Sequence, residues 1–206
     1  MAIVDAGSLD AEEAYKLLTG AVVPRPVAWV TSLSAGGKVN LAPFSCFTFV
    51  ANDPPMLAIS VGRRLGAAKD TSRNIEERKD FVVHIALESQ VALVHESSEE
   101  HPPEVSDAEV LGLETVASRH VRAPRLAAAP VAMECRHAQT IEFGRLRTQL
   151  VVGEVLCFHV DDALWTGKRI DAERFRPVAR LGGPRYATLG EVITLRPVAV
   201  SPRTAS

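Results

Sequence analysis

The most restrictive feature of this sequence is a pair of long apolar runs that carry polar residues at alternating positions. Residues 130–143 and 150–160 are rich in Val, Cys and Phe. This alternation is typical of strands with one face in a core, and two such runs in succession favour neighbouring antiparallel strands. The other apolar segments have a similar, strand-like composition. The sequence therefore predicts a mainly β chain with short helices inserted between strands.

Turn residues divide the rest of the chain into further elements. Residues 27–33 are β-branched and aromatic, residues 34–38 form a Gly-containing turn, and a second apolar run begins at Val39, so a hairpin is expected. Further strands are expected at 56–61 and 81–87, and short helices at 9–18, 69–78 and 90–94. Residues 96–109 are expected to form a surface excursion, and the tail 197–206 to be frayed.

A proline interrupts the run from Val39 to Thr48. Pro43 would remove a ladder hydrogen bond from a central strand, so we expect this segment to leave the regular ladder and keep backbone groups free for a ligand. About twenty residues later, Lys69–Asn74 places a cation, hydroxyls and amides at the expected start of a helix. Backbone N–H groups and the macrodipole favour an anion there. The two segments together predict a planar, phosphorylated ligand.

Length and charge limit the class of protein. A chain of 206 residues suits one domain with a sizeable core, spanning residues 1–206. Its 23 basic and 25 acidic residues give a net charge of −2 without a basic run, so nucleic acid is not an expected partner. The start of the chain lacks a secretory pattern, and no segment is apolar over a membrane-spanning length. A cytoplasmic protein without membrane association is expected.

The cysteines and histidines show no metal-ligand spacing. Cys46, Cys135 and Cys157 form no CxxC pair, and the six histidines form no HExxH motif, so no metal is expected. We expect Cys135 and Cys157 to be small buried residues, whereas the position of Cys46 beside Pro43 leaves a redox or cofactor-facing role open. The Gly-x-Gly-x-x-Gly fingerprint of a Rossmann domain for NAD is absent.

Five segments, in order, resemble a known family. They are residues 24–31 (PRPVAWVT), residues 40–47 (NLAPFSCF), residues 69–74 (KDTSRN), residues 153–155 (GEV) and residues 179–186 (ARLGGPRY). The chain resembles the flavin-reductase-like proteins with an FMN-binding split barrel, especially their flavoredoxin-like members. The resemblance covers about residues 10–195. It implies a six-stranded antiparallel Greek-key split barrel, and a homodimer with FMN near the subunit interface.

The resemblance also implies cofactor contacts at matching positions. The segment from Asn40 to Phe47 would line the isoalloxazine, with the hydroxyls of Ser45 and Thr31 beside it. The ribityl chain and the phosphate would be held by Ser60, Gly62, Arg63 and the Lys69–Asn74 segment, since cations and neutral donors can neutralise a dianion without a metal. The expected cofactor-binding residues are Arg25, Thr31, Asn40, Ala42, Pro43, Phe44, Ser45, Cys46, Phe47, Ser60, Gly62, Arg63, Lys69, Asp70, Thr71, Asn74 and Tyr186.

Several of these residues have a structural alternative. Arg25 is either a solvated turn residue or a contact near the phosphate or the dimer partner. Asp70 is favoured as a helix N-cap or a partner of Lys69 over a catalytic acid. Trp29 is favoured as a core residue over a stacking partner. Asn74 faces either the ligand or solvent, and Tyr186 either forms part of a tight turn or reaches the open face of the flavin.

The function implied by the resemblance is an FMN-binding oxidoreductase that passes hydride or electrons through flavin N5, with no catalytic residue assigned to the protein. Many reductases of this family carry a Gly-Asp-His triplet, for which this chain has Leu146-Arg147-Thr148. NADH or NADPH as donor is therefore in doubt, although Arg145 and Arg147 offer cations for a nicotinamide phosphate. Three roles stay open: the reductase component of a two-component monooxygenase, a flavoredoxin-type electron-transfer protein, and a non-catalytic flavin-binding module.

Overall fold

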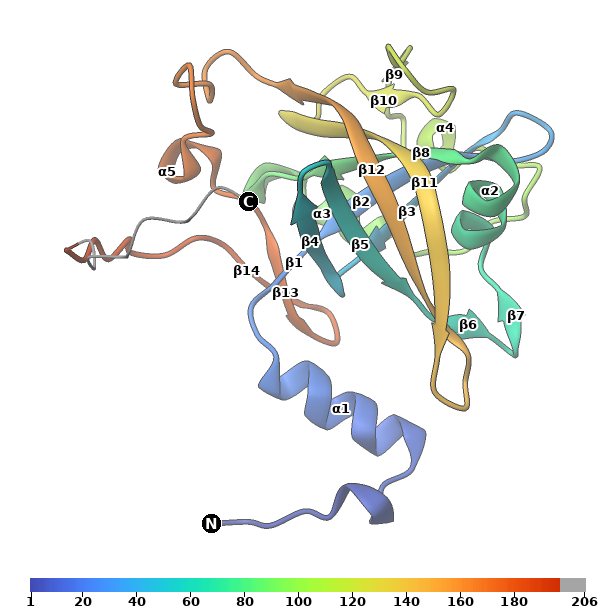
Figure 1. Ribbon diagram of the computed structural model, residues 1–206, viewed down its shortest axis with the longest axis vertical. Helices are drawn as coiled ribbons and strands as arrows, with labels where there is room; N and C mark the ends of the chain where they lie inside the picture. Colours follow the sequence, from blue (N-terminus) through green and yellow to red (C-terminus); the bar gives the residue numbers. More distant parts are fainter. Residues whose placement is uncertain (197–206) are drawn as a thin grey trace.

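The structure, a computed structural model, describes residues 1–196, and the expected frayed tail at 197–206 lies outside the described residues. Its main element is a seven-stranded sheet in which every neighbouring pair is antiparallel, in the order β3-β2-β8-β11-β12-β5-β4 (Figure 1). The strands are β2 (Ala28–Leu33), β3 (Val39–Phe44), β4 (Phe47–Asn52), β5 (Pro55–Val61), β8 (Asp80–Ile85), β11 (Val131–Phe143) and β12 (Thr148–Val160).

The long strands β11 and β12 form one hairpin, as the alternating pattern predicts. The register runs from Val131 opposite Val160 to Phe143 opposite Thr148, with two register shifts. Gly144 and Arg147 have φ of 66° and 51°, and this left-handed backbone closes the connection. The hairpin joins the two halves of the sheet, because β11 also pairs with β8 and β12 with β5.

The strand count corrects the expectation of six. Residues 39–52 supply two strands, and these occupy the two opposite edges of the sheet, β3 on β2 and β4 on β5. Only Ser45 and Cys46 connect them, so the two edges must lie next to each other and the sheet must curve round on itself. We call this junction the seam. Ser60 N–H donates to the Cys46 carbonyl there at 2.8 Å.

The expectation that Pro43 leaves the ladder is wrong. Pro43 lies in β3 in register with Trp29. The backbone N–H of Leu41, two residues earlier on the same side, points away from β2 and donates to Asp107. Pro43 therefore occupies a position whose nitrogen faces outward from an edge strand, where a proline removes no ladder bond.

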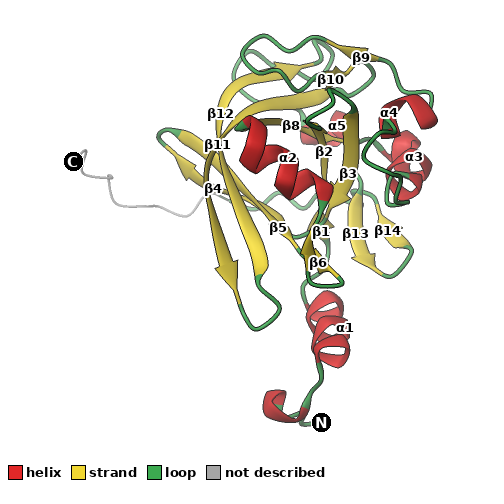
Figure 2. Cartoon of the chain, turned by 90° about the vertical axis from the view of Figure 1, so that its right-hand side faces the viewer, coloured by secondary structure: helices red, strands yellow, loops and turns green. Residues whose placement is uncertain are grey.

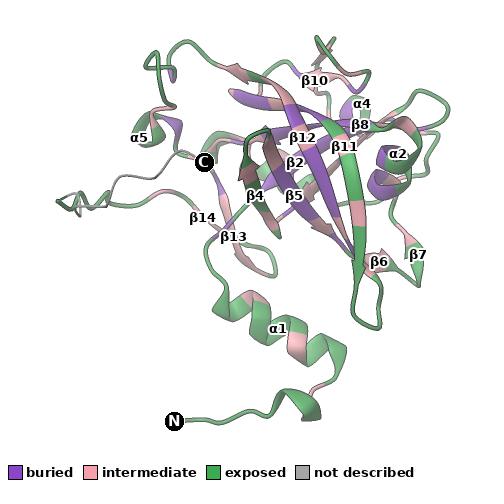
Figure 3. Ribbon diagram, viewed as in Figure 1, coloured by how far each residue is buried: buried purple, intermediate pink, exposed green. Residues whose placement is uncertain are grey.

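The two larger apolar clusters lie inside the barrel and on the outer face of the sheet. Buried residues line the central strands of the sheet (Figure 3). The barrel interior holds large buried side chains such as Ile59 and Phe81, together with Cys135, which is buried as predicted. A second cluster on the outer face surrounds Trp29, which is fully buried and donates from Nε1 to Ser97 Oγ at 2.8 Å. Trp29 is thus a core residue, as expected.

Most helices are short and pack around the sheet, whereas α1 protrudes from the body (Figures 1 and 2). The α-helices are α1 (Ala11–Ala21), α2 (Asp70–Arg78), α3 (Val91–Glu96), α4 (Asp107–Val110) and α5 (Ala172–Phe175), with 3-10 turns at Ala6–Ser8 and Glu88–Gln90. The small strands are β1 (Arg25–Pro26), β6 (Arg63–Arg64), β7 (Ala67–Ala68), β9 (Thr115–Val116), β10 (Arg125–Leu126), β13 (Ala179–Gly182) and β14 (Arg185–Ala187). Within the described residues, no helix combines the length and the apolar character needed to cross a membrane.

Candidate functional site

A cleft of about 540 Å³ lies along the outward edge of β3. This volume falls within the range of small-molecule and cofactor sites. Three walls surround the cleft: the edge of β3, the start of α2 with the β6–β7 hairpin before it, and the loop from Ser97 to Asp107. Of the expected cofactor-binding residues, the cleft brings together Asn40, Ala42, Pro43, Phe44, Lys69, Asp70 and Thr71.

The loop wall is attached to β3 through Asp107. Its Oδ2 accepts the Leu41 backbone N–H at 2.8 Å, and its Oδ1 lies 3.0 Å from His101 Nδ1. Sequence patterns missed this wall, because residues 96–109 show no periodicity and the Asp107 contact joins segments 66 residues apart. With the Leu41 N–H engaged and no N–H on Pro43, the outward edge of β3 presents carbonyl oxygens to the cleft.

The start of α2 forms the opposite wall. Lys69 occupies the N-cap position and makes no side-chain capping bond. The expectation that Asp70 caps the helix is wrong, because Asp70 is the first helical residue and its carboxylate pairs with Arg73. The first N–H groups of α2 thus have no side-chain cap, and together with the macrodipole they favour an anion.

A polar network holds α2 against the β2–β3 hairpin. Asn40 Nδ2 donates to Thr71 Oγ1 at 2.9 Å and to Ser32 Oγ at 3.3 Å. Asn74 Nδ2 donates to the same Ser32 Oγ at 3.2 Å. Asn74 is buried and directed inward, so it does not face solvent. This network fixes the distance between the β3 edge and the helix start, and so sets the width of the cleft.

The charges of the cleft are largely paired with one another. Arg64 forms an ion pair with Glu100, and Arg73 with Asp70. Among residues 1–196, Lys69 has no carboxylate within ion-pair distance. The unpaired cation and the uncapped helix start therefore coincide at one end of the cleft.

Four expected site residues lie on the seam beside the cleft. Ser45, Cys46 and Phe47 connect or begin the two edge strands, and Ser60 bonds the Cys46 carbonyl. Cys46 is exposed, whereas Ser45 Oγ accepts from Arg25 Nε at 3.4 Å. Ser45, Cys46 and Phe47 therefore extend the β3 wall of the cleft beyond Phe44, the last residue of the strand.

Arg25 is not the solvated turn residue that the sequence left open. It is buried and donates to the carbonyl oxygens of Thr19 at 2.8 Å, Val22 at 2.5 Å and Leu181 at 3.0 Å. These bonds tie the end of α1 and strand β13 to the seam. Arg25 therefore reaches the site through Ser45 alone.

Thr31, Gly62 and Arg63 lie outside the cleft lining. Thr31 is fully buried and donates to the Pro124 carbonyl at 2.6 Å. Arg63 donates to the Arg147 carbonyl at 2.9 Å and pairs with Glu142. Glu142 also accepts from Arg147 Nε at 2.7 Å, and these arginine bonds hold the pKa of Glu142 below its ordinary value. Arg63 and Arg147 therefore both form ion pairs with Glu142, near the turn of the β11–β12 hairpin.

Tyr186 also lies outside the cleft lining, on β14. Its hydroxyl bonds Arg180, whose guanidinium carbon lies 4.4 Å from the ring centroid, and lies 3.3 Å from His95 Nδ1. Burial raises the pKa of Tyr186 despite the nearby Arg180 charge. The tyrosine therefore packs the β13–β14 hairpin against α3.

A separate group of potential metal ligands lies on the β11–β12 hairpin: Glu134, Cys157 and His159. Cys157 is half-exposed, so the expectation of a buried residue is wrong. Sequence spacing missed this group because the register of two strands, and not one local motif, brings Glu134 opposite Cys157.

The fold and the cleft match one class of protein. The flavin reductase like domain family matches residues 20–172, and the chain belongs to this family.

Three solved structures illustrate the similarity. Nitrilotriacetate monooxygenase component B from Bacillus cereus is 40% identical, with 95% of this chain and 98% of that chain covered and a TM-score of 0.91. The 2-nitrobenzoate 2-nitroreductase NbaA from Pseudomonas fluorescens is 32% identical over 99% and 100% of the two chains, with a TM-score of 0.87. The flavoredoxin of Desulfovibrio vulgaris (Miyazaki F) is 25% identical over 84% and 91%, with a TM-score of 0.75.

Proposed function

We propose that this protein is an FMN-binding oxidoreductase, formed by one domain over residues 1–206, whose cofactor occupies the cleft at the edge of β3. The observation that carries the proposal is the coincidence of Lys69 with the uncapped start of α2, opposite a strand edge that presents carbonyl groups. An anionic group and a flat, hydrogen-bonding ring system match the two walls. Both properties belong to FMN.

The phosphate end of the proposed site is the start of α2. Lys69 supplies a charge, the first N–H groups of the helix supply donors, and Thr71 lines the same wall. Each donor to a charged acceptor contributes more than a neutral hydrogen bond. A phosphate would sit here without a metal ion.

The ring end of the proposed site is the edge of β3 and its continuation along the seam. The carbonyl groups of Leu41 and Pro43 face outward, and a carbonyl accepts from a ring N–H. Phe44 adds apolar surface to the lining, and Ser45, Cys46 and Phe47 extend the wall. Ser60 lies beside this wall on the seam, where we expect it to contact the ribityl chain.

Bound FMN would supply hydride and electron transfer at its N5 atom, and the protein would supply position and electrostatics. His101 lines the cleft, and the carboxylate of Asp107 orients its imidazole. A histidine held by a carboxylate in this way keeps a defined ring orientation. We assign it a positioning role on the loop wall.

An absorbance spectrum of the purified protein with added FMN, followed by anaerobic addition of NADH and NADPH, tests the proposal. We expect binding to shift the absorbance spectrum of FMN and to quench its fluorescence. Colourless protein that leaves the fluorescence of added FMN unchanged would contradict it. Bleaching by one nicotinamide would identify the donor.

A flavoredoxin-type electron carrier is the second candidate. The observation that favours it is that this chain has Leu146-Arg147-Thr148, with no histidine, where many family members have a Gly-Asp-His triplet, and that Arg147 is engaged with Glu142. Flavin that binds but is not bleached by either nicotinamide, and is reduced by a protein donor, would select this candidate. Tight binding without turnover from any donor would instead indicate a non-catalytic flavin-binding module.

We further propose a homodimer, and a partner oxygenase that receives reduced flavin. Component B of nitrilotriacetate monooxygenase, by its name, belongs to a multicomponent oxygenase, and its 40% identity to this chain supports the second proposal. The exposed apolar side chains of the protruding helix α1 support the first.

A further inference from the structure

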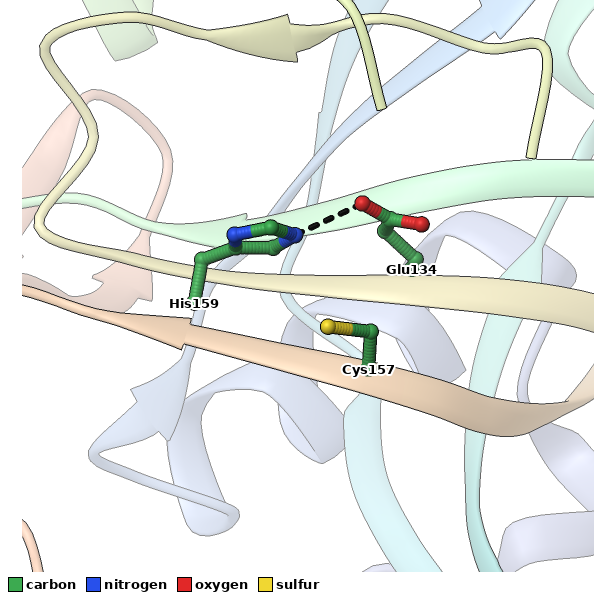
Figure 4. A group of neighbouring side chains, drawn as sticks. All are labelled: Glu134, Cys157 and His159. Atoms are coloured by element: carbon green, nitrogen blue, oxygen red, sulfur yellow. Dashed lines mark hydrogen bonds and ion pairs between the residues drawn. The ribbon is translucent and has the colours of Figure 1, made fainter. Parts of the chain in front are cut away.

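A second candidate site lies on the outer face of the β11–β12 hairpin (Figure 4). Cys157 and His159 are two residues apart on β12 and so share a face, and Glu134 stands opposite Cys157 on β11. The neighbour of Glu134, Cys135, packs into the barrel interior, so Glu134 points outward. One ligand atom from each side chain lies within 4.8 Å of the other two.

Glu134 is fully buried beneath the loop around residue 120. Its Oε1 accepts the Arg119 backbone N–H at 2.7 Å and lies 2.6 Å from His159 Nε2, and its Oε2 accepts the His120 backbone N–H at 2.6 Å. Burial alone would raise the pKa of Glu134, but these hydrogen bonds outweigh it and hold the pKa below its ordinary value. Backbone N–H groups that donate to both oxygens suit an ionised carboxylate.

Among the described residues, Glu134 forms an ion pair with His159 and with no lysine or arginine. A buried charge is stabilised by hydrogen bonds, by an opposite charge or by a metal ion. Three donors already serve Glu134. A cation between it and the two side chains of β12 would replace the charge that a protonated His159 supplies.

We propose that Glu134, Cys157 and His159 bind one thiophilic divalent metal ion of the Zn²⁺ type. Thiolate, imidazole and carboxylate are the three ligand classes of Zn²⁺, whereas Ca²⁺ and Mg²⁺ prefer oxygen alone. Three protein ligands leave a fourth tetrahedral position for water. The half-exposed Cys157 and His159 give the ion a route from solvent.

Small movements suffice to admit the ion. Two ligand atoms at about 2.1 Å from a tetrahedral ion lie about 3.4 Å apart, so the 2.6 Å contact between His159 Nε2 and Glu134 Oε1 must widen by less than about 1 Å. The imidazole proton moves to Nδ1, and the thiol proton is released to solvent. The backbone N–H groups of Arg119 and His120 keep their bonds to Glu134 and so orient its carboxylate toward the ion.

The test is a titration of the purified, metal-free protein with Co²⁺, followed by optical absorption. We expect a thiolate-to-cobalt charge-transfer band and the intense visible bands of tetrahedral Co²⁺, both complete at about one equivalent. Added Zn²⁺ should displace Co²⁺ and abolish the bands. Zn²⁺ should also raise the thermal unfolding temperature, since it binds the folded chain.

Cys157→Ser is the main variant, because its side chain is half-exposed and its loss leaves the Glu134 hydrogen bonds intact. The charge-transfer band should disappear in this variant and persist in Cys46→Ser, which removes an exposed thiol on the seam. His159→Gln should weaken Co²⁺ binding at least tenfold, whereas His137→Gln on the same hairpin should not. Absence of the band in the wild-type protein, or its persistence in Cys157→Ser, would overturn the proposal.

Discussion

His84 sits in the middle of the sheet with no exposed surface. Its Nδ1 lies 2.9 Å from the Trp29 carbonyl, and its Nε2 accepts the Leu126 N–H at 3.0 Å. These contacts define the neutral tautomer with the proton on Nδ1. The side chain thus connects β2, β8 and the β10 segment through one imidazole.

Burial lowers the pKa of His84 from its ordinary value of 6.5 to about 4, and the charges of Arg125 and His159 act in the same direction. Between these two values the unfolded chain binds the proton and the folded chain does not. The free energy of unfolding should therefore fall as the pH drops from 6.5 to 4, by roughly 3 kcal/mol. Urea unfolding at about pH 7 and about pH 4.5, followed by circular dichroism, measures this loss.

A matched pair of variants isolates the histidine. His84→Gln should be less stable at neutral pH but should lose less stability on acidification. His120→Gln, at an exposed position, should keep the wild-type pH dependence. An unchanged slope in His84→Gln would assign the acid sensitivity to other groups.

Gly153 shows how close packing restricts one residue of the Gly-Glu-Val segment. A Cβ added there would lie 2.5 Å and 2.8 Å from two ring atoms of Phe81 and 3.3 Å from the Cys135 Cβ. Gly153→Ala should destabilise the protein by about 1–3 kcal/mol, because the fully buried Phe81 ring has no room to move. Thermal or urea unfolding measures the change. Gly190→Ala, where a Cβ meets nothing within 4 Å, should leave stability nearly unchanged.

At the scale of elements, the helix α2 tests the proposed phosphate anchor. Lys69→Gln keeps the side-chain length and removes the charge, so FMN affinity should fall about tenfold, which corresponds to about 1.4 kcal/mol. Lys79→Gln is the control, because Lys79 lies at the opposite end of the same helix. Fluorescence titration of FMN measures both. Equal affinities for Lys69→Gln and wild type would remove α2 from the phosphate site.

Local patterns predicted the elements that local forces determine. The β2–β3 and β11–β12 hairpins follow alternation and turn chemistry, and α2 begins at Asp70, close to the expected start at 69. The separate strand β4 was not predicted, because its pairing with β5 at the far edge depends on the closure of the whole sheet. Two-residue strands such as β6 and β9 carry no pattern at all.

The candidate site divides in the same way. The β3 edge and the start of α2 could be predicted because proline, lysine and hydroxyl residues mark them in the sequence. The Ser97–Asp107 wall could not, because one carboxylate contact to Leu41 positions it. Arg25 was expected at a solvated turn, near the phosphate or at the dimer contact. Its carbonyl partners, Thr19, Val22 and Leu181, depend instead on tertiary packing.

At the scale of the whole molecule, α1 is the part least explained by one chain. The helix begins with a capping box formed by Asp10 and Glu13, yet none of its eleven residues is buried. An isolated helix of this length is marginal in water. Tyr15, Leu17 and Leu18 expose apolar surface that a second copy of the chain would cover.

Paired substitution on this helix tests the homodimer. Leu17→Glu combined with Leu18→Glu places two charges on the apolar face and should convert the dimer to a monomer in sedimentation experiments. Lys16→Gln removes only an exposed ion pair with Glu12 and should leave the dimer intact. A wild-type protein that sediments as a monomer, or a double variant that stays dimeric, would contradict the assignment.

The seam between β3 and β4 has a consequence for motion. Within the described chain, the two edge strands are joined by the Ser45–Cys46 connection and by no β-ladder. Separation at this line breaks no strand pairing, so it is the least costly local opening of the barrel. Amide hydrogen exchange should therefore be faster along the outer edge of β4 than in β11 and β12, whereas on β3 the outward N–H of Leu41 is held by Asp107. A molecule that enters the cleft would contact the seam, where the barrel opens most easily. Its binding should therefore slow amide exchange at the seam.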